Sequence, residues 1–132
     1  MSGYDRYRDG GGFEQVAAYS RAARHGRWIA VSGTGDVAGD GTVGHPGDAY
    51  GQARAALERA LDAVERLGGR REDVIRTRLY LVPGTDWRGA VRAHRELLEG
   101  VDPANTTLYV AGFPVEGMLV EVEVDAALSD DA

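Results

Sequence analysis

The last regular stretch of the chain, residues 118–126, constrains the fold more than any other. From Val120 onward, small apolar residues alternate with acidic ones, and a period of two is that of a β-strand with one buried face. The apolar face needs helices to cover it, while the carboxylates point to the uncovered side of the sheet. A second β-like run, residues 106–110, precedes it across a turn region that contains Gly112, Pro114 and Gly117.

Two amphipathic segments can provide the helices. Asp48 can cap a helix that ends at a pair of glycines at 68–69. A second helix starts at Thr85 or Asp86 and ends at Gly100. In both segments apolar residues recur at helical spacing, which indicates one buried stripe. The predicted stripes are Ala53, Ala56, Leu57, Ala60, Leu61, Val64 and Leu67 in the first helix, and Trp87, Ala90, Val91, His94, Leu97 and Leu98 in the second.

The remaining strands complete one sheet. Residues 74–82 alternate between an apolar and a polar side, and residues 15–23 and 28–32 are predicted to form a hairpin around a turn at 25–27. This order of elements predicts an α+β fold with a single mixed sheet and two helices packed on one face. In the strand at 74–82 we expect Ile75, Thr77, Leu79 and Leu81 on one side and Arg76, Arg78 and Tyr80 on the other.

Length and composition limit the chain to one domain. It has 132 residues, of which 43% are hydrophobic, enough for one modest core and no second one. Residues 1–12 are rich in Gly, Asp, Arg and Tyr without periodicity, and we expect a flexible N-terminal arm there. Residues 13–132 then form the single domain.

Charge and residue types exclude several function classes. The formal net charge of -6 argues against nucleic-acid binding, which normally begins with a basic patch. The chain has no cysteine and its 15 basic residues are all arginine, so thiol chemistry and lysine Schiff bases are absent. No apolar run approaches the roughly 20 residues of a membrane span, and the N-terminus lacks an apolar signal core. We expect a cytoplasmic protein that binds neither nucleic acid nor membrane.

The three histidines do not suggest a metal site. His25 and His45 lie in predicted turns, and no two histidines have the spacing of a metal-binding pair. His94 falls in the apolar stripe of the second helix, which favours a core histidine over a residue at the edge of a cleft beside Trp87. We expect no metal.

Several short motifs, in their order and spacing, resemble the RidA family, also called YjgF-like or reactive intermediate deaminases. The similarity runs over residues 19–127. It implies a chorismate-mutase-like fold and a homotrimer whose ligand clefts lie between subunits. It also implies hydrolysis of imines and enamines without metal or cofactor. The matching marks are Ala18-Tyr19-Ser20-Arg21-Ala22, Val31-Ser32-Gly33, Gln52, Glu72-Asp73-Val74 with Thr77, Pro103-Ala104 and Val120-Glu121-Val122-Glu123.

The chain departs from the family pattern inside the cleft. In the members with the archetypal activity, an arginine directly after the Pro-Ala pair clamps the substrate carboxylate through a bidentate contact. Asn105 occupies that position here, Val91 replaces a frequent asparagine, and Thr34 follows Ser32-Gly33 instead of glutamine. The chain is therefore similar to a subgroup that lacks the clamping arginine.

The resemblance implies a set of site residues. Glu121 is the candidate for acid/base work on water, because a carboxylate desolvated between subunits can have its pKa raised. The alternative role for Glu121 is that of a cross-strand salt-bridge partner. Glu123 and Asp125 are expected to form structural pairs with Arg76 and Arg78. The candidate ligand-binding residues are Tyr19, Ser32, Gly33, Asn105 and Thr107, with ordinary packing or turn closure as the alternative for each.

Two classes of function remain open at this point. One is a cofactor-free imine or enamine hydrolase, or a pathway-specific tailoring enzyme, that binds a small imine, enamine or carbonyl compound between subunits. The other is a non-catalytic ligand-binding or regulatory trimer.

Overall fold

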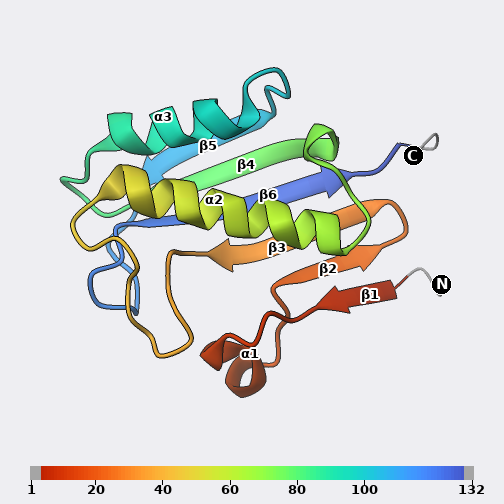
Figure 1. The fold of residues 1–132 in the computed structure, drawn as a ribbon, viewed down its shortest axis with the longest axis horizontal. Helices are drawn as coiled ribbons and strands as arrows, with labels where there is room; N and C mark the ends of the chain where they lie inside the picture. Colours follow the sequence, from red (N-terminus) through yellow and green to blue (C-terminus); the bar gives the residue numbers. More distant parts are fainter. Residues whose placement is uncertain (1–3, 130–132) are drawn as a thin grey trace.

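A computed structural model describes residues 4–129 and contains one six-stranded sheet with two long helices on one face (Figure 1). The strands lie in the spatial order β1-β2-β3-β6-β4-β5. The predicted single mixed sheet with its two helices is thereby confirmed. The elements are β1 (Tyr4–Tyr7), α1 (Gly12–Ala17), β2 (Ala22–His25), β3 (Trp28–Thr34), α2 (Ala49–Arg66), the 3-10 turn η1 (Arg71–Asp73), β4 (Val74–Leu81), α3 (Trp87–Leu98), β5 (Ala104–Tyr109) and β6 (Val120–Ala127).

Strand β6 lies inside the sheet and joins its two halves. It pairs antiparallel with β3 on one side and with β4 on the other, and β4 pairs parallel with β5. The parallel pair is connected through α3, as a parallel connection requires a crossover. The alternation predicted for β6 is confirmed, because Val120, Val122 and Val124 are fully buried while Glu121 and Glu123 are half-buried on the opposite face.

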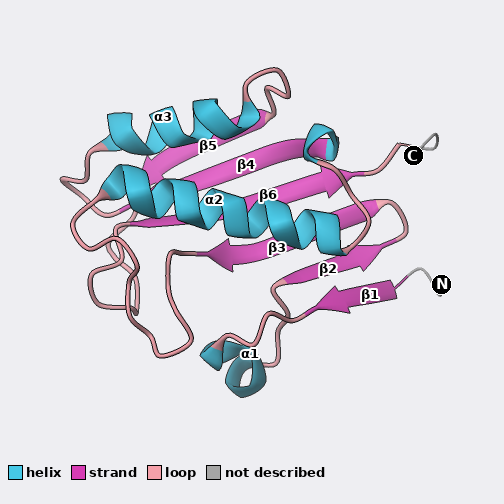
Figure 2. Ribbon diagram, in the orientation of Figure 1, coloured by secondary structure: helices cyan, strands magenta, loops and turns pink. Residues whose placement is uncertain are grey.

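The helices begin and end where the sequence predicts. Asp48 caps α2 by accepting a hydrogen bond from the Gly51 amide, and Asp86 caps α3 through the Gly89 amide. Both helices cover the same face of the sheet, and the short α1 lies apart from them beside the N-terminal strands (Figure 2). Between sheet and helices lies one core, whose largest fully buried apolar residues are Ile29, Leu57, Val64, Leu79, Leu81, Leu98 and the β6 valines.

Three residues placed on buried faces by the sequence pattern are exposed. Ile75 is 42% exposed because the pairing of β4 with β6 shifts register between Val74 and Arg76, so that a bulge turns the intervening side chain outward. Trp87 and Val91 are 44% and 40% exposed. The buried side of α3 is narrower than the predicted stripe. Ala90, Leu97 and Leu98 of that stripe are buried, together with Gly89 and Ala93.

The N-terminal region differs from its prediction. Residues 4–7 form the edge strand β1, paired with β2, where the sequence suggests an arm without regular structure. Residues 12–17 are helical where a strand over 15–23 is expected. The Glu14 side chain accepts hydrogen bonds from the Gly10 and Asp9 amides and fastens this segment, while residues 1–3 of the expected arm lie outside the described part of the chain.

Gln52 fixes the loops around α2. Its side chain is fully buried, and its Nε2 donates to the carbonyl oxygens of His45 and Gly117, each at 3.1 Å. Its Oε1 accepts from the Leu119 amide at 2.8 Å. One amide therefore satisfies three backbone groups from segments that are far apart in the sequence.

We predict that Gln52→Leu lowers the free energy of unfolding by about 2–4 kcal/mol, because a leucine of similar size leaves those three backbone groups without partners. Chemical denaturation followed by circular dichroism measures this. Gln15→Leu, at an exposed position of α1, is the matched control and should change stability by less than about 0.5 kcal/mol. Equal stability of the two variants would refute the assignment.

Candidate functional site

A cavity of about 710 Å³ brings together three of the predicted site residues, Tyr19, Gly33 and Glu121. It lies where the N-terminal segment, the loop after β3 and the turn before β6 meet. Much of its lining is backbone, because seven glycines contribute to it. The walls come from residues 9–13, residues 37–41 and the side chains of Pro114, Val115 and Met118.

Glu121 reaches the cavity because of the local geometry of β3. The pairing of β3 with β6 shifts register between Val31 and Thr34, so Gly33 lies in an irregular part of the strand. The Glu121 carboxylate lies directly over this glycine, and a Cβ built on Gly33 would be 2.4 Å from Glu121 Oε1. No larger residue fits at this position unless the carboxylate moves. The glycine of the Val-Ser-Gly motif thus leaves room for the carboxylate.

The surroundings of Glu121 favour its protonated form. Burial raises the pKa of Glu121 above its usual value, the neighbouring carboxylate of Glu123 adds to this, and the positive charge of Arg21 opposes it. Among the described residues, no hydrogen bond or ion pair holds the Glu121 carboxylate. A half-buried carboxyl group with a raised pKa and no fixed partner is suited to exchange protons with a ligand or water.

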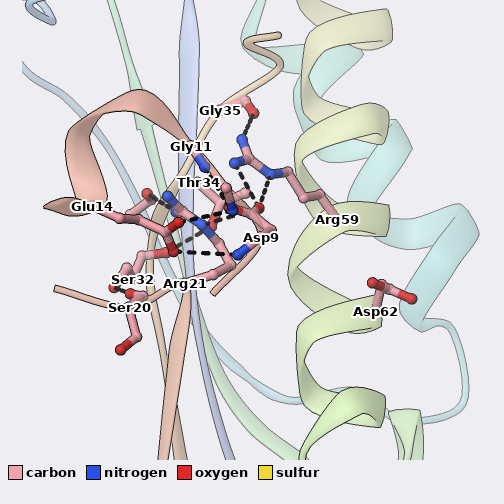
Figure 3. Close-up of polar contacts among 12 residues, drawn as sticks. Asp9, Gly11, Glu14, Ser20, Arg21, Ser32, Thr34, Gly35, Arg59 and Asp62 are labelled. Carbon is pink, nitrogen blue, oxygen red and sulfur yellow. Dashed lines mark hydrogen bonds and ion pairs between the residues drawn. The ribbon is translucent and has the colours of Figure 1, made fainter. Parts of the chain in front are cut away.

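A group of three charged residues that the sequence does not predict lies in the same cavity (Figure 3). Arg59 from α2 contacts Asp9 Oδ2 through Nη2 at 2.7 Å and through Nε at 2.8 Å, and its Nη1 donates to the Gly35 carbonyl at 3.0 Å. Arg21 approaches the same Asp9 oxygen at 3.5 Å. Burial acts to raise the pKa of Asp9, but Arg59 and Arg21 outweigh it and the pKa is lowered. We call these residues the Asp9–Arg21–Arg59 cluster.

Arg21 also fixes the strand end that carries the site. Its side chain is almost fully buried, and its Nη1 donates to the Gly33 carbonyl at 2.7 Å and to Thr34 Oγ1 at 3.1 Å. Its guanidinium lies 5.7 Å from the centre of the Tyr19 ring. The arginine of the Tyr-Ser-Arg motif therefore positions both Tyr19 and Gly33.

Ser32 points away from the larger cavity. Its hydroxyl donates to the Ser20 carbonyl at 2.6 Å, and it lines a second cavity of about 450 Å³ on the uncovered face of the sheet, with Tyr19, Arg78, Glu123 and Asp125 among the other lining residues. Tyr19 borders both cavities. The Ser32 side chain therefore binds the backbone of Ser20 and lines the second cavity, not the one that contains Glu121.

Asn105 and Thr107 lie on the other face of the sheet from Glu121. Asn105 Nδ2 donates to Thr77 Oγ1 at 3.0 Å, and Thr107 Oγ1 donates to Asn105 Oδ1 at 2.8 Å. Thr77 is fully buried on the helix side, where its hydroxyl is 2.7 Å from His94 Nε2. Within one chain, these two residues line neither of the two cavities.

His94 is half-buried, beside the core and not within it, and its ring is hydrogen-bonded to Thr77. Burial lowers the pKa of His94, so the ring is neutral at pH 7. Because Asn105 donates to the Thr77 hydroxyl, that hydroxyl can in turn donate to the neutral Nε2. His94 therefore fixes the orientation of the Asn105 amide through Thr77.

The other acidic residues of β6 form structural pairs, in part as predicted. The Tyr80 hydroxyl donates to Glu123, and Arg78 lies 3.9 Å from Glu123 Oε1 and 3.4 Å from Asp125 Oδ2. Arg76 instead donates to Thr106 Oγ1 at 3.2 Å. In the described part of the chain, no group of three or more His, Asp or Glu side chains could hold a metal ion, and no helix is long and apolar enough to cross a membrane.

The comparisons with known proteins agree on one family. The family model described as Endoribonuclease L-PSP matches residues 12–128. An uncharacterized protein of Streptomyces coelicolor is 38% identical over 121 residues, which are 92% of this chain and 90% of that protein.

Two solved structures are similar to this chain in fold. Rv2704 of Mycobacterium tuberculosis, a member of the YjgF/YER057c/UK114 family, matches with a TM-score of 0.84 at 31% identity, covering 95% of this chain and 99% of its own. Escherichia coli TdcF, solved with bound serine, matches with a TM-score of 0.74 at 23% identity over 84% of this chain and 88% of its own.

The fold therefore defines an α+β protein with the chorismate-mutase-like sheet of the YjgF type. The chain belongs to the YjgF/YER057c/UK114 family, as the RidA-like motifs indicate. The homotrimer and the individual site residues remain predictions.

We predict that Glu121→Gln stabilises the protein at neutral pH. A folded-state pKa raised above the unfolded value means that ionising Glu121 costs stability as pH rises through that interval, and glutamine removes the cost. Thermal unfolding should show a higher Tm for the variant at pH 8 and little difference at pH 4. Glu123→Gln, which weakens the contacts with Tyr80 and Arg78, should lower the Tm at pH 8. A lower Tm for Glu121→Gln at pH 8 would contradict this assignment.

Proposed function

We propose that this protein is a homotrimer that binds a small imine, enamine or carbonyl compound in a cleft between subunits and hydrolyses the imine or enamine without a cofactor. The observation that carries the proposal is Glu121, a half-buried carboxyl group of raised pKa that faces a cavity and has no fixed partner among the described residues. Membership of the YjgF/YER057c/UK114 family supports small-molecule binding.

The chemistry needs one group that both gives and takes a proton. The protonated Glu121 carboxyl donates its proton to the imine nitrogen, and the resulting carboxylate takes a proton from a water molecule whose oxygen bonds to the imine carbon. The tetrahedral carbinolamine then breaks its C–N bond, and a second proton transfer through Glu121 releases ammonia and the carbonyl compound. The raised pKa suits both directions of transfer near neutral pH.

The trimer would complete the site. In one chain the Glu121 side chain and the Asn105 amide lie on opposite faces of the sheet. A cleft between subunits would place Asn105 and Thr107 of the partner subunit across from Glu121. The exposed Leu108 and Tyr109 on the edge strand β5 offer apolar surface for such an interface.

The second candidate is a non-catalytic ligand-binding or regulatory trimer, and the hydrogen bonds of the Asn105 side chain favour it. Both polar ends of the Asn105 amide already have partners, in Thr77 and Thr107, and asparagine carries no charge for a substrate carboxylate. Ribonuclease activity, which the family description Endoribonuclease L-PSP suggests, fits less well with a net charge of -6.

Turnover distinguishes the two candidates. With 2-iminobutyrate and a carboxylate-free imine generated in situ, we expect the wild type to release ammonia faster than buffer does. Glu121→Ala should reduce that rate by about 100-fold or more, because general acid–base catalysis is lost. Glu116→Ala, at an exposed carboxylate in the turn before β6, is the matched control and should retain the rate.

The substitution Asn105→Arg introduces the arginine that clamps the substrate carboxylate in the members with the archetypal activity. We expect it to lower the KM for 2-iminobutyrate and to leave the carboxylate-free imine unaffected, because the added guanidinium contacts only a carboxylate. If neither the wild type nor Asn105→Arg hydrolyses any imine, the hydrolase is excluded and the non-catalytic trimer is retained.

Oligomeric state is a separate test. Light scattering in solution should give the mass of three chains. A stable monomer would remove the cleft between subunits, and with it the role of Asn105 and Thr107.

A further inference from the structure

The two arginines that share a cavity with Glu121 bind a different carboxylate. Both Arg21 and Arg59 are directed at Asp9 (Figure 3). Arg59 contacts Asp9 Oδ2 through two nitrogens, at 2.7 and 2.8 Å, and Arg21 Nε lies 3.5 Å from the same oxygen. In the described part of the chain neither arginine forms an ion pair with Glu121, although all of these residues line one cavity.

Asp9 is held in place by its own segment as well as by the arginines. Its Oδ1 accepts a hydrogen bond from the Gly11 amide at 3.3 Å, and its amide donates to Glu14 Oε2 at 3.3 Å. Asp9 is ionised at neutral pH, since its pKa lies below the usual value. A fixed carboxylate at this place competes with Glu121 for the two guanidinium groups.

Removal of the Asp9 charge would leave Arg59 Nε and Nη2 without their acceptor. Two other carboxylates line the cavity, Asp40 and Glu121. Asp40 already accepts hydrogen bonds from the Thr42 amide and hydroxyl. The Glu121 carboxylate has no hydrogen bond or ion pair with any described residue. Glu121 is therefore the carboxylate with which a released guanidinium group would pair.

An ion pair at Glu121 would oppose the task that we propose for it. A neighbouring guanidinium group favours the ionised carboxylate, whereas proton donation needs the protonated form. The positive charges of the cavity come from Arg21 and Arg59. The other charged or titratable side chains that face Glu121 are Glu123 on the same strand, Tyr80 opposite it on β4, and Asp9, Tyr19 and Asp40 in the cavity.

We propose that Asp9 is a positioning residue, which binds Arg21 and Arg59 and so keeps the Glu121 carboxyl group without a cationic partner. The inference rests on the proposed function only in giving Glu121 the task of proton transfer. The arrangement of charges can be tested without turnover.

Titration of the Glu121 side-chain carboxyl carbon by NMR measures the effect on the full chain, with Glu121→Gln to identify its signal. We expect Asp9→Asn to move the titration midpoint of Glu121 to lower pH by about half a pH unit or more, because a guanidinium group then stabilises the carboxylate. Asp40→Asn is the matched control, since it removes the same charge from the same cavity and releases no arginine. Its shift should be clearly smaller. Equal shifts in the two variants, or no shift in Asp9→Asn, would overturn the proposal.

The double variant Asp9→Asn/Arg59→Gln separates the effect of charge from a loosening of the N-terminal segment. A Glu121 side chain that became better hydrated would also titrate at lower pH. If the released guanidinium group causes the shift, its removal should return the midpoint most of the way to that of the wild type. A double variant that titrates as low as Asp9→Asn refutes the proposal.

Arg59→Gln alone serves if Asp9→Asn does not fold. It should leave the midpoint of Glu121 unchanged or raise it, because it removes a positive charge from the cavity. Arg54→Gln, on the same helix but paired with Glu58 and Glu96 outside the cavity, is its control and should cause no change. A lower midpoint in Arg59→Gln would contradict the proposal. Failure of imine hydrolysis would refute the proposed function and leave these midpoints standing, and the reverse also holds.

Discussion

The alternation of residues along β6 is the constraint on which the rest of the structure depends. The strand has a neighbour on each side, so its register with β3 and β4 fixes both halves of the sheet. A slip of one residue would exchange the valines with the carboxylates. Burial of Val120, Val122 and Val124 beneath the helices therefore forces Glu121 onto the opposite face. The packing of the core therefore also places Glu121, the candidate catalytic residue, on the opposite face of the sheet.

The second requirement is the irregular part of β3 at Gly33. A regular strand with a larger residue there would displace the Glu121 carboxylate, because a Cβ would lie 2.4 Å from its Oε1. Arg21 holds this irregular backbone through the Gly33 carbonyl. A buried arginine, a glycine and a carboxylate from three segments thus depend on one another. This dependence is a physical reason for the Tyr-Ser-Arg and Val-Ser-Gly motifs in this chain.

The sequence predicts the parts of the fold that have strong local signals. The caps at Asp48 and Asp86 and the period of β6 locate the two long helices and the last strand correctly. It misplaces Ile75, because a bulge depends on pairing with another strand. It also misses the edge strand β1 and the helix α1, because Glu14 fastens that segment to backbone amides and gives no periodic pattern. Asp9 and Arg59 are 50 residues apart, and no motif joins them, so only the tertiary structure shows that both belong to the cavity that holds Glu121.

The distribution of charge around the cavity changes the meaning of Asn105. Judged from the motif alone, a neutral residue after Pro103-Ala104 removes the cation that would recognise an anionic ligand. In the structure two guanidinium groups already line the cavity that contains Glu121, whereas Asn105 lines neither cavity of the single chain. Both form ion pairs with Asp9, which lies in the N-terminal segment, before the motifs that identify the family. The position of the two guanidinium groups therefore depends on how the N-terminal segment packs, and a neutral residue after the Pro-Ala pair does not leave the cavity without positive charges.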